Sequence, residues 1–379
     1  MKGLCCILFS VLLFFSNCKD AKQQQHPEDQ IVITPGNPSN FVENLSPYLD
    51  TVIVLPLETN QQSLISYISK MLILPDESFI VSTPTSILMF DAEGKYIRTL
   101  GQKGRGPEEY YGAEDICLDQ ENKILNILAP DNQVVGYKIG DGSFAFRTPV
   151  RHPSEQLGFE AIASGPDGSF FLYCGENRKK ESQENHTLFH FSSEGKLLHS
   201  DLPCLDYPIN MYLITQTYDN RYILRPQNQD NVCYYLNDSL PNPRLRIDFG
   251  EKTLSNRYSP DLQTYLRSDY YKMPIYIHET ADQLFFTFCG AGAWEHYCIH
   301  SFSNDKTIVW KRKGSDTTNM LLIIGSDKEF FYGLYLDYRA PEEIPLDETD
   351  LLKREIVQRT RIQLQEDSNP CLIKIKFKI

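Results

Sequence analysis

Five side chains of this sequence could support acid–base or metal-assisted chemistry if the fold brought them together. They are the carboxylates of Glu114, Asp115, Glu160 and Glu279 and the imidazole of His278. Two carboxylates and a histidine that converge can hold a divalent cation or move a proton on a bound substrate. Carboxylates are also ordinary beside a narrow hydrated channel, and the sequence contains neither a Ser-His-Asp order nor a nucleophile elbow. These residues are therefore candidates for a ligand site, with catalysis as the alternative.

A glycine-rich stretch, LGQKGRGPEEYYG at residues 100–112, raises the question of phosphate binding. A P-loop needs Lys-Ser/Thr after its last glycine, and the dinucleotide fingerprint needs Gly-x-Gly-x-x-Gly at the start of a helix. Neither order occurs here, and the chain that follows leads into a strand near Ile116. The stretch is therefore predicted to connect two sheets, where its glycines allow positive φ and close packing. The alternative is that Arg105, Glu109 and Tyr110 contact a ligand at the mouth of a channel.

No other pattern predicts a metal or cofactor site. His296 and His300 have the spacing of a helical zinc pair, but their surroundings predict a strand and no third ligand is evident. The ten cysteines form no CxxC pair, so neither a zinc site nor a disulfide framework is predicted. Trp294 falls in an expected loop, where it could stack on a sugar, anchor a partner or simply pack. We expect no cofactor, except a divalent cation under the catalytic alternative.

The composition and the amino terminus indicate where the protein acts. A net charge of −13 argues against nucleic acid or an anionic membrane surface as a partner. Residues 1–18 combine a basic Lys2, a short apolar core and an ending that resembles a lipobox apart from Asn17, which predicts a lipoprotein signal peptide with lipid attachment at Cys18. The alternative is an ordinary secretory signal with a chance cysteine. Residues 19–40 are polar and Gln-rich, so we expect a flexible tether before a domain at 41–379.

The elements that would position these candidates follow from an internal repeat. A pattern of one acidic residue, two further residues and an aromatic or aliphatic run recurs every 45 to 63 residues, with copies that start at Asp76, Glu121, Asp167, Asp219, Asp282 and Asp327. A repeat of this length with strand-like content predicts a β-propeller of six four-stranded blades. A β-sandwich or two unrelated β-domains would not give six similar units. Single acidic residues in turns do not predict calcium binding, which needs about six converging oxygens.

Two distant segments are expected to close the ring. TVIVLPLE at 51–58 precedes the first blade and CLIKIKFKI at 371–379 ends the chain, so the two can pair in the last blade and leave no open edge. Residues 347–363 carry apolar side chains at roughly helical spacing, with Asp347 or Thr349 as the cap, which predicts a short helical insertion in that blade. The innermost strands of a propeller line its channel, where Gln216 is expected to join the five candidates.

At this point the chain resembles the six-bladed β-propeller lipoproteins of bacterial envelopes, of the TolB-like and NHL-like kind. The resemblance covers about residue 50 to 379 and is carried by four stretches: FDAEGKYIRTLGQKGRGPEEY (90–110), NVCYYLNDSLPNPRLRIDFG (231–250), ETADQLFFTF (279–288) and NPCLIKIKFKI (369–379). It implies a surface or periplasmic propeller and brings no catalytic residue. The fold hosts lactonases, lyases and binding scaffolds alike, so it does not decide the function.

We therefore predict an exported, lipid-anchored monomer that acts as a binding or interaction module at the cell envelope, with an envelope protein, a peptide or a glycan as partner. Only the lipid would contact the membrane, either the outer membrane or another membrane that faces the periplasm, with the cell surface as a further location. The alternative is a lactonase-like hydrolase or lyase with an acidic channel site. Convergence of the five candidates within metal-ligand reach would favour the enzyme, whereas dispersal, or neutralisation by Lys or Arg, would favour the binding module.

Overall fold

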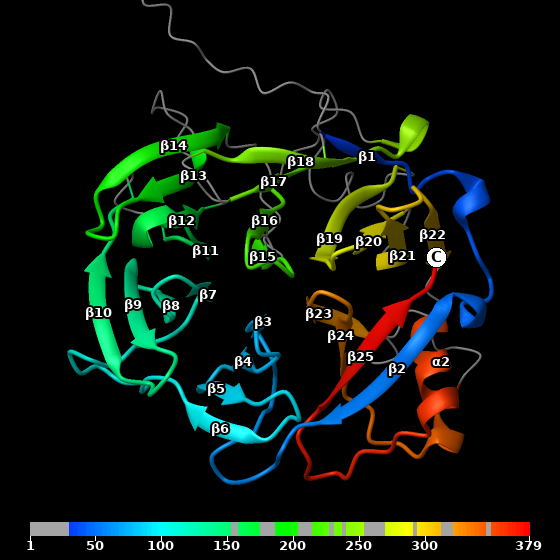
Figure 1. Ribbon diagram of the computed structural model, residues 1–379, viewed down its shortest axis with the longest axis horizontal. Coiled ribbons are helices and arrows are strands. Elements are labelled where there is room, and N and C mark those ends of the chain that lie inside the picture. The colour runs from blue at the N-terminus through cyan, green and yellow to red at the C-terminus, as the bar shows by residue number, and fades with distance from the viewer. Residues whose placement is uncertain are drawn as a thin grey trace, which may run out of the picture.

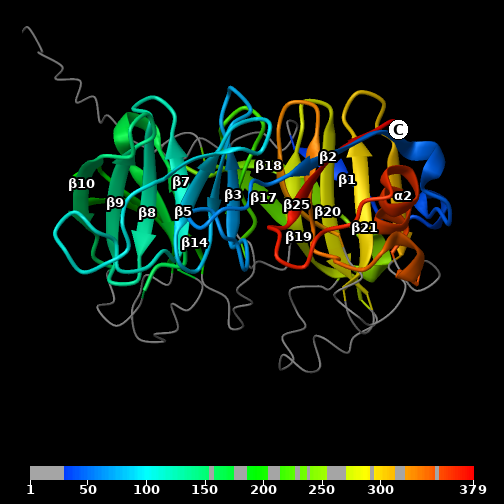
Figure 2. The same ribbon diagram turned by 90° about the horizontal axis from the view of Figure 1, so that it is seen from below.

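The computed structural model describes residues 30–152, 158–174, 186–203, 214–226, 231–236, 240–253, 270–290, 294–311, 321–345 and 350–379, and the statements below concern these residues. Their strands form six sheets arranged as a ring around a central axis (Figure 1). The prediction of an all-β, six-bladed propeller is therefore confirmed. Seen from the side, the molecule is a flat disc whose strands run between its two faces (Figure 2).

Each of the first five blades follows the chain from its innermost strand outwards, and the sixth combines both ends of the chain. The first three blades are β3 to β6 (Lys70–Ile73, Phe79–Ser82, Ile87–Phe90, Tyr96–Thr99), β7 to β10 (Asp115–Asp119, Ile124–Ala129, Gln133–Lys138, Phe144–Pro149) and β11 to β14 (Ala161–Ser164, Phe170–Tyr173, His186–Phe191, Leu197–Pro203). The next two are β15 to β18 (Ile214–Gln216, Tyr222–Leu224, Val232–Tyr235, Asn242–Ile247) and β19 to β22 (Lys272–Glu279, Gln283–Cys289, Trp294–Ser301, Thr307–Lys311). The sixth blade contains β23 (Leu322–Ser326), β24 (Phe331–Tyr335), β25 (Cys371–Phe377) and β2 (Leu49–Pro56).

The repeated apolar runs form the middle of each blade. Every residue of β4 and β5 is buried, whereas the outer strand β6 alternates between partly buried and exposed positions. Middle strands are buried on both faces because each blade packs against its neighbours, so they read as continuous apolar runs. One cluster of buried side chains joins Ile80 of the first blade to Ile116 and Ile127 of the second. Each such side chain contributes about 1.5–3 kcal/mol through burial.

The two chain ends meet in the sixth blade. β2 runs antiparallel to β25, with Val54 opposite Ile373 and Val52 opposite Ile375. The pair lies side by side in Figure 1, where β2 is blue and β25 is red. β25 lies within the predicted segment 371–379, and β2 overlaps the predicted segment 51–58 but begins two residues earlier, at Leu49. Hydrogen bonds between β2 and β25 therefore close the ring of blades by joining a strand near the amino terminus to the last strand of the chain.

The segment expected to be a flexible tether is in part folded. Ile31–Ile33 forms β1, which pairs in parallel with β18 and places Ile33 opposite Ile247. Further on, the backbone N–H of Val42 donates to the carbonyl of Val309 in β22 at 2.8 Å. Residues 30–48 therefore run along the outer edges of the fourth and fifth blades before the chain enters β2 (Figure 1). Residues 1–29, which include the predicted signal peptide and Cys18, lie outside the described residues.

One α-helix, α2 (Leu351–Thr360), is inserted in the sixth blade between β24 and β25, near the predicted position. Its amino terminus is capped by Asp350, whose carboxylate accepts hydrogen bonds from the backbone N–H groups of Leu352 and Lys353. The predicted caps Asp347 and Thr349 lie outside the described residues. Within the described part of the chain, no helix combines the length and hydropathy that a membrane crossing requires.

Two of the acidic residues that mark the repeat, Asp76 and Asp327, stabilise the turn between the first and second strands of their blades. The carboxylate of Asp76 accepts from the backbone N–H of Ser78 at 3.1 Å, and that of Asp327 accepts from Glu329 and Phe330 at 2.7 Å each. A short acidic side chain that satisfies its own turn in this way is common at chain reversals. These acidic residues therefore have a structural role in their turns.

Candidate functional site

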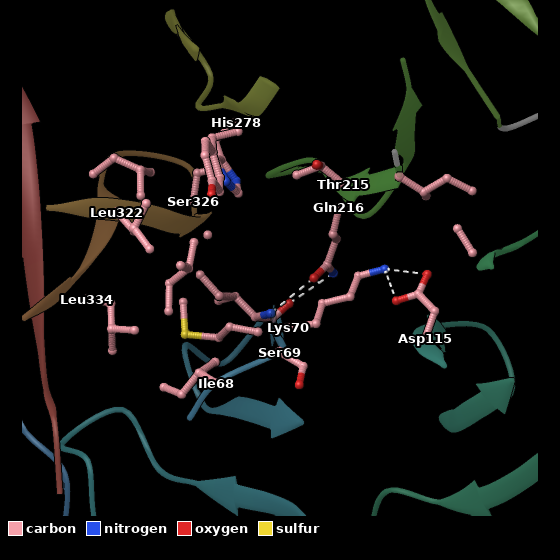
Figure 3. A pocket seen from close by; sticks show the side chains of 18 of the residues that line it. Ile68, Ser69, Lys70, Asp115, Thr215, Gln216, His278, Leu322, Ser326 and Leu334 are labelled. Carbon is pink, nitrogen blue, oxygen red and sulfur yellow. Dashed lines mark hydrogen bonds and ion pairs between the residues drawn. The ribbon is translucent and has the colours of Figure 1, made fainter. Parts of the chain in front are cut away.

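The six innermost strands enclose a central cavity of about 270 Å³ (Figure 3). Every blade contributes to its wall, because the lining residues come from β3, β7, β11, β15, β19 and β23 or directly adjoin them. Tyr67 and Leu336 lie on this wall and are also exposed to solvent, with 48% and 46% of their surface accessible. They mark the open end of the cavity, on the face of the disc where the innermost strands begin.

The opposite end of the cavity is crossed by hydrogen bonds between distant blades. The side chain of Gln216, in the fourth blade, accepts from the backbone N–H of Ile73 in the first blade and donates to its carbonyl, both at 3.0 Å. The hydroxyl of Tyr222 accepts from the backbone N–H of Leu118 in the second blade at 2.7 Å. Gln216 and Tyr222 are buried, so these bonds are shielded from water. The channel is thereby narrowed to a pocket with a polar floor.

One side of the cavity carries the acidic groups. Lys70 donates to both carboxylate oxygens of Asp115, at 2.7 and 2.9 Å, and Asp115 also accepts from the backbone N–H of Ile162 at 2.9 Å. Asp115 is therefore neutralised and satisfied by groups of the protein itself. Glu114, which is exposed, and Glu160, which is partly buried, add two further carboxylates to the same wall. Among the lining residues that the structure describes, the side chains thus include three carboxylates and one ammonium.

His278 lines the cavity from the fifth blade and is 5% exposed. Burial, which disfavours the charged imidazole, lowers its pKa to about 3, although a hydrogen bond with the backbone of Ile323 opposes this shift. That bond raises the pKa because an imidazole N–H donates to a carbonyl. Nδ1 is buried and has no hydrogen-bond partner among the described residues.

Tyr276 occupies a strained position on the same wall. Its φ is 49°, in the left-handed region that non-glycine residues avoid at a cost of about 1–2 kcal/mol. The pairing of β19 with β20 shifts register between Ile275 and His278, so this strand bulges where it faces the cavity. Strain of this kind persists only where surrounding structure imposes it, and it concentrates at binding and catalytic sites.

The rest of the wall is apolar. Leu322 and Leu334 of the sixth blade lie across the cavity from Asp115 (Figure 3), and Ile68 and Met71 of the first blade extend this surface. The cavity is thus polarised, with carboxylates on the side of the second and third blades and aliphatic groups on the side of the sixth and first. Such a mixture of apolar surface and a few placed polar groups is typical of small-molecule sites, although the volume is near their lower limit of about 300 Å³.

Of the residues selected from the sequence, Glu114, Asp115, Glu160, His278 and Gln216 all line the cavity. Glu279 does not. It is 2% exposed and lies between the fourth and fifth blades, where the hydroxyl of Tyr235 is 2.8 Å from Oε1, and Arg244 is 3.6 Å from the same oxygen. Neighbouring residues of a strand point to opposite faces, so His278 and Glu279 cannot share one site.

The glycine-rich connection between β6 and β7 also lies away from the cavity. The carboxylate of Glu109 accepts a hydrogen bond from the backbone N–H of Gly106 at 2.7 Å. The backbone carbonyl of Glu109 accepts one from the guanidinium of Arg147. Tyr110 is buried against the ring of Tyr137, with ring centroids 6.1 Å apart. The guanidinium of Arg105 lies 5.1 Å from the ring centroid of Tyr111, in the same connection. These contacts join the first blade to the second, and a ligand contact of Arg105, Glu109 and Tyr110 stays a prediction.

The remaining candidates belong to β21, in the fifth blade. Trp294 begins this strand, and its side chain lies outside what the structure describes. His296 stacks on Phe288 with ring centroids 4.8 Å apart, and burial lowers its pKa to about 4. The Nδ1 atom of His300 is 2.9 Å from the hydroxyl of Thr307. Both histidines are thus packed into their blade. Across the described residues, no three His, Cys, Asp or Glu side chains gather closely enough to hold a metal ion.

The sequence analysis did not select Lys70 or Tyr276 for the cavity. Lys70 is the cation of the acidic wall, and a lysine directly before the apolar run MLIL of the predicted inner strand was the signal for it. Tyr276 had no comparable signal, since its importance follows from a backbone conformation that depends on the bulge in β19. Lys70 converts Asp115 from a free carboxylate to a paired one, and so changes the chemistry available to the site.

Comparison with known proteins identifies relatives of the same architecture. The family model described as "Domain of unknown function (DUF4934)" matches residues 32–376. A crystal structure of a Bacteroides fragilis NCTC 9343 protein inferred to be exported covers 92% of this chain and 99% of its own, with a TM-score of 0.67 and 16% identity. A member of the DUF4221 family from Bacteroides vulgatus ATCC 8482 covers 87% and 97%, with a TM-score of 0.52 and 10% identity. At these identities the likeness establishes the fold alone. No curated protein matches the chain significantly.

Proposed function

Because the chain belongs to the DUF4934 family and shares its fold with a protein inferred to be exported, we propose that it is an exported binding module whose ligand enters the central cavity. The observation that carries this proposal is the cavity itself, which all six blades line and which hydrogen bonds cross at one end. A site of this form holds a small molecule or the end of a larger one, such as a peptide or a glycan.

The state of the acidic groups favours binding over catalysis. Asp115 is held by Lys70, and Glu279 is buried elsewhere with Tyr235 and Arg244. Neutralisation and dispersal were the features that distinguish a binding module from a metal-assisted hydrolase or lyase. Glu114, Glu160 and His278 also line the cavity, and such polar groups on a mostly apolar wall are suited to recognition of a ligand.

The proposal includes a lipid anchor at Cys18. With β1 already paired to the fourth blade at Ile31, only the 12 residues 19–30 lie between the anchor and the disc. A fully extended chain spans about 3.3–3.6 Å per residue, so the disc would lie within about 45 Å of the membrane. A Cys18→Ala protein should leave the membrane fraction. If it remained membrane-bound, the anchor would be wrong while the binding proposal would stand.

Binding is tested by filling the cavity. Thr215 lines it, and Thr215→Phe would place an aromatic ring in the space. Thr34 is exposed beside β1, so Thr34→Phe is a matched control on the outside of the disc. We expect amino acid amides, dipeptides and monosaccharides, screened by thermal shift and calorimetry, to include compounds that bind wild type and Thr34→Phe but not Thr215→Phe. Equal binding by all three proteins, or no binding by any of them, would reject the cavity as the ligand site.

A further inference from the structure

We propose that Tyr276 is a side chain through which the central cavity recognises its ligand, and that the distorted backbone of β19 is kept for this contact. This inference rests on the proposed function and deepens it by naming a residue that the bound molecule touches. It follows from three features of Tyr276, which are its left-handed backbone within a strand, the irregular pairing of that strand and the place of the side chain on the cavity wall.

The backbone conformation of Tyr276 is unusual for its place in the fold. In the part of the chain that the structure describes, ten non-glycine residues have a positive φ, and eight of them lie in turns or beside the ends of strands and helices. The other two, Tyr276 and Leu202, lie within strands, and Leu202 belongs to β14 at the outer edge of the third blade. A bulky residue with a positive φ is an outlier that turn geometry does not explain here.

The pairing of β19 with β20 accounts for this backbone. Ile275 pairs with Thr287, and His278 pairs with Phe285. Between these two pairs β19 advances by three residues and β20 by two, so β19 contains one extra residue where Tyr276 lies. An extra residue of this kind is a β-bulge, which bends its strand, re-aims side chains and is common next to active sites. The distortion therefore falls where the strand lines the cavity.

The side chain of Tyr276 lines the cavity and is only partly buried. β19 is flanked by β15 and β23, which contribute Thr215 and Ile323 to the same wall. A tyrosine combines a large apolar ring with a hydroxyl and has few rotatable bonds, so it gains contact area at a low cost in entropy. Tyrosine is also enriched among the residues that dominate binding energies. The uncovered part of this ring is thus available to a molecule in the cavity.

The strain at position 276 indicates that the ring has a use. A glycine would adopt the same left-handed backbone without a steric penalty, so a tyrosine is the costlier residue at this bulge. Strained residues of this kind gather at ligand clamps and active sites, where the surrounding structure holds them in place. Packing within the free protein does not enclose the ring of Tyr276 completely. Contact with a bound molecule accounts for an aromatic side chain at this strained position.

The strain is measured by urea unfolding of Tyr276→Gly and Tyr276→Ala, both of which remove the ring. At a φ of 49° the glycine variant should be favoured, by about fivefold in the folding equilibrium constant. Tyr96, which is also partly buried, is the matched control because it lies in the outermost strand of the first blade and is not among the residues with a positive φ. There the alanine variant should be the more stable one. A Tyr276→Ala protein as stable as Tyr276→Gly would overturn the inference.

Recognition is measured by calorimetry on the intact mature protein with a panel of amino acid amides, dipeptides and monosaccharides. We expect every compound that binds the wild type to bind Tyr276→Gly at least about tenfold more weakly and to bind Tyr96→Gly unchanged. If Tyr276→Gly does not fold, Tyr276→Asn makes the same comparison, since asparagine tolerates the left-handed region. Wild-type affinity in the Tyr276 variant would refute the contact.

Thr215→Phe separates this inference from the proposed function. If Thr215→Phe abolishes binding while Tyr276→Gly leaves it unchanged, the cavity is the ligand site and the role of Tyr276 is wrong. If Thr215→Phe also binds as the wild type does, the cavity is not the site and the proposed function fails. An absence of binding by the wild type across the whole panel would reject both.

Discussion

Replacement of His278 by glutamine should remove a large part of the acid sensitivity of the fold. The imidazole is buried and its pKa falls from 6.5 to about 3 on folding, because burial disfavours the charged ring. The unfolded chain therefore takes up a proton at a higher pH than the folded chain does. The stability contributed by the neutral ring is complete above pH 6.5 and is lost progressively as the pH falls toward 3.

The size of this effect follows from linkage. Each unit of difference in pKa corresponds to about 1.36 kcal/mol. Between about pH 7 and about pH 4.5 the unfolded chain becomes protonated at His278 while the folded chain does not, so the wild type should lose about 2–3 kcal/mol through this group. His278→Gln cannot titrate, and its amide N–H can replace the donor to the backbone of Ile323. The variant should therefore lose about 2–3 kcal/mol less than the wild type over the same range.

The assay is urea unfolding at the two pH values, followed by the fluorescence of the buried Trp310 and by circular dichroism. The quantity compared is the change in unfolding free energy with pH, so contributions from His296 and His300, whose pKa values burial also lowers, cancel between the proteins. His199→Gln, at an exposed site of β14, is the matched control and should behave as wild type. Equal pH dependence in wild type and His278→Gln would refute the argument that His278 is held neutral.

Three further substitutions test the contacts that shape the disc. Gly104→Ala would place its Cβ onto the carboxylate of Glu109, which would have to move and release the backbone N–H of Gly106, so urea unfolding should show a loss of about 1 kcal/mol with the cavity intact. Gln216→Ala leaves buried backbone groups of the opposite blade unpaired and should cost about 1–3 kcal/mol, with faster hydrogen exchange at Ile73. Lys353→Met removes the 2.8 Å ammonium partner of buried Asp337, while the guanidinium of Arg339 stays paired with the same carboxylate, so the change should cost about 1–3 kcal/mol in unfolding free energy.

The blades could be predicted because their signal is local. Asp76, Asp167 and Asp327 each precede an apolar run by a fixed distance, and the turn and the strand both follow from that short sequence. β1 could not be predicted in the same way. Ile31–Ile33 is a short apolar stretch within polar, proline-containing surroundings, and it becomes a strand only because the outer edge of β18 offers it hydrogen bonds. This pairing depends on residues more than 200 positions away in the sequence, so no local pattern predicts it.

The residues that line the cavity could be predicted in so far as they belong to, or adjoin, the innermost strands. Glu114, Glu160 and His278 were placed on the wall because polar residues at those strands face the axis. The same rule failed for Glu279, since only one of two adjacent strand residues can face inward. Which of these side chains are paired depends on contacts between blades, such as the ion pair of Lys70 with Asp115. Such contacts exist only in the assembled ring and cannot be predicted from any one repeat.

The distribution of partners around the cavity explains why one wall can be both acidic and stable. Asp115 accepts hydrogen bonds from the ammonium of Lys70 and from the backbone N–H of Ile162, so its charge is balanced inside the protein. Glu114 is exposed and keeps its hydration until a ligand arrives. The wall can therefore be acidic and stable because its enclosed carboxylate is paired and its exposed one stays hydrated.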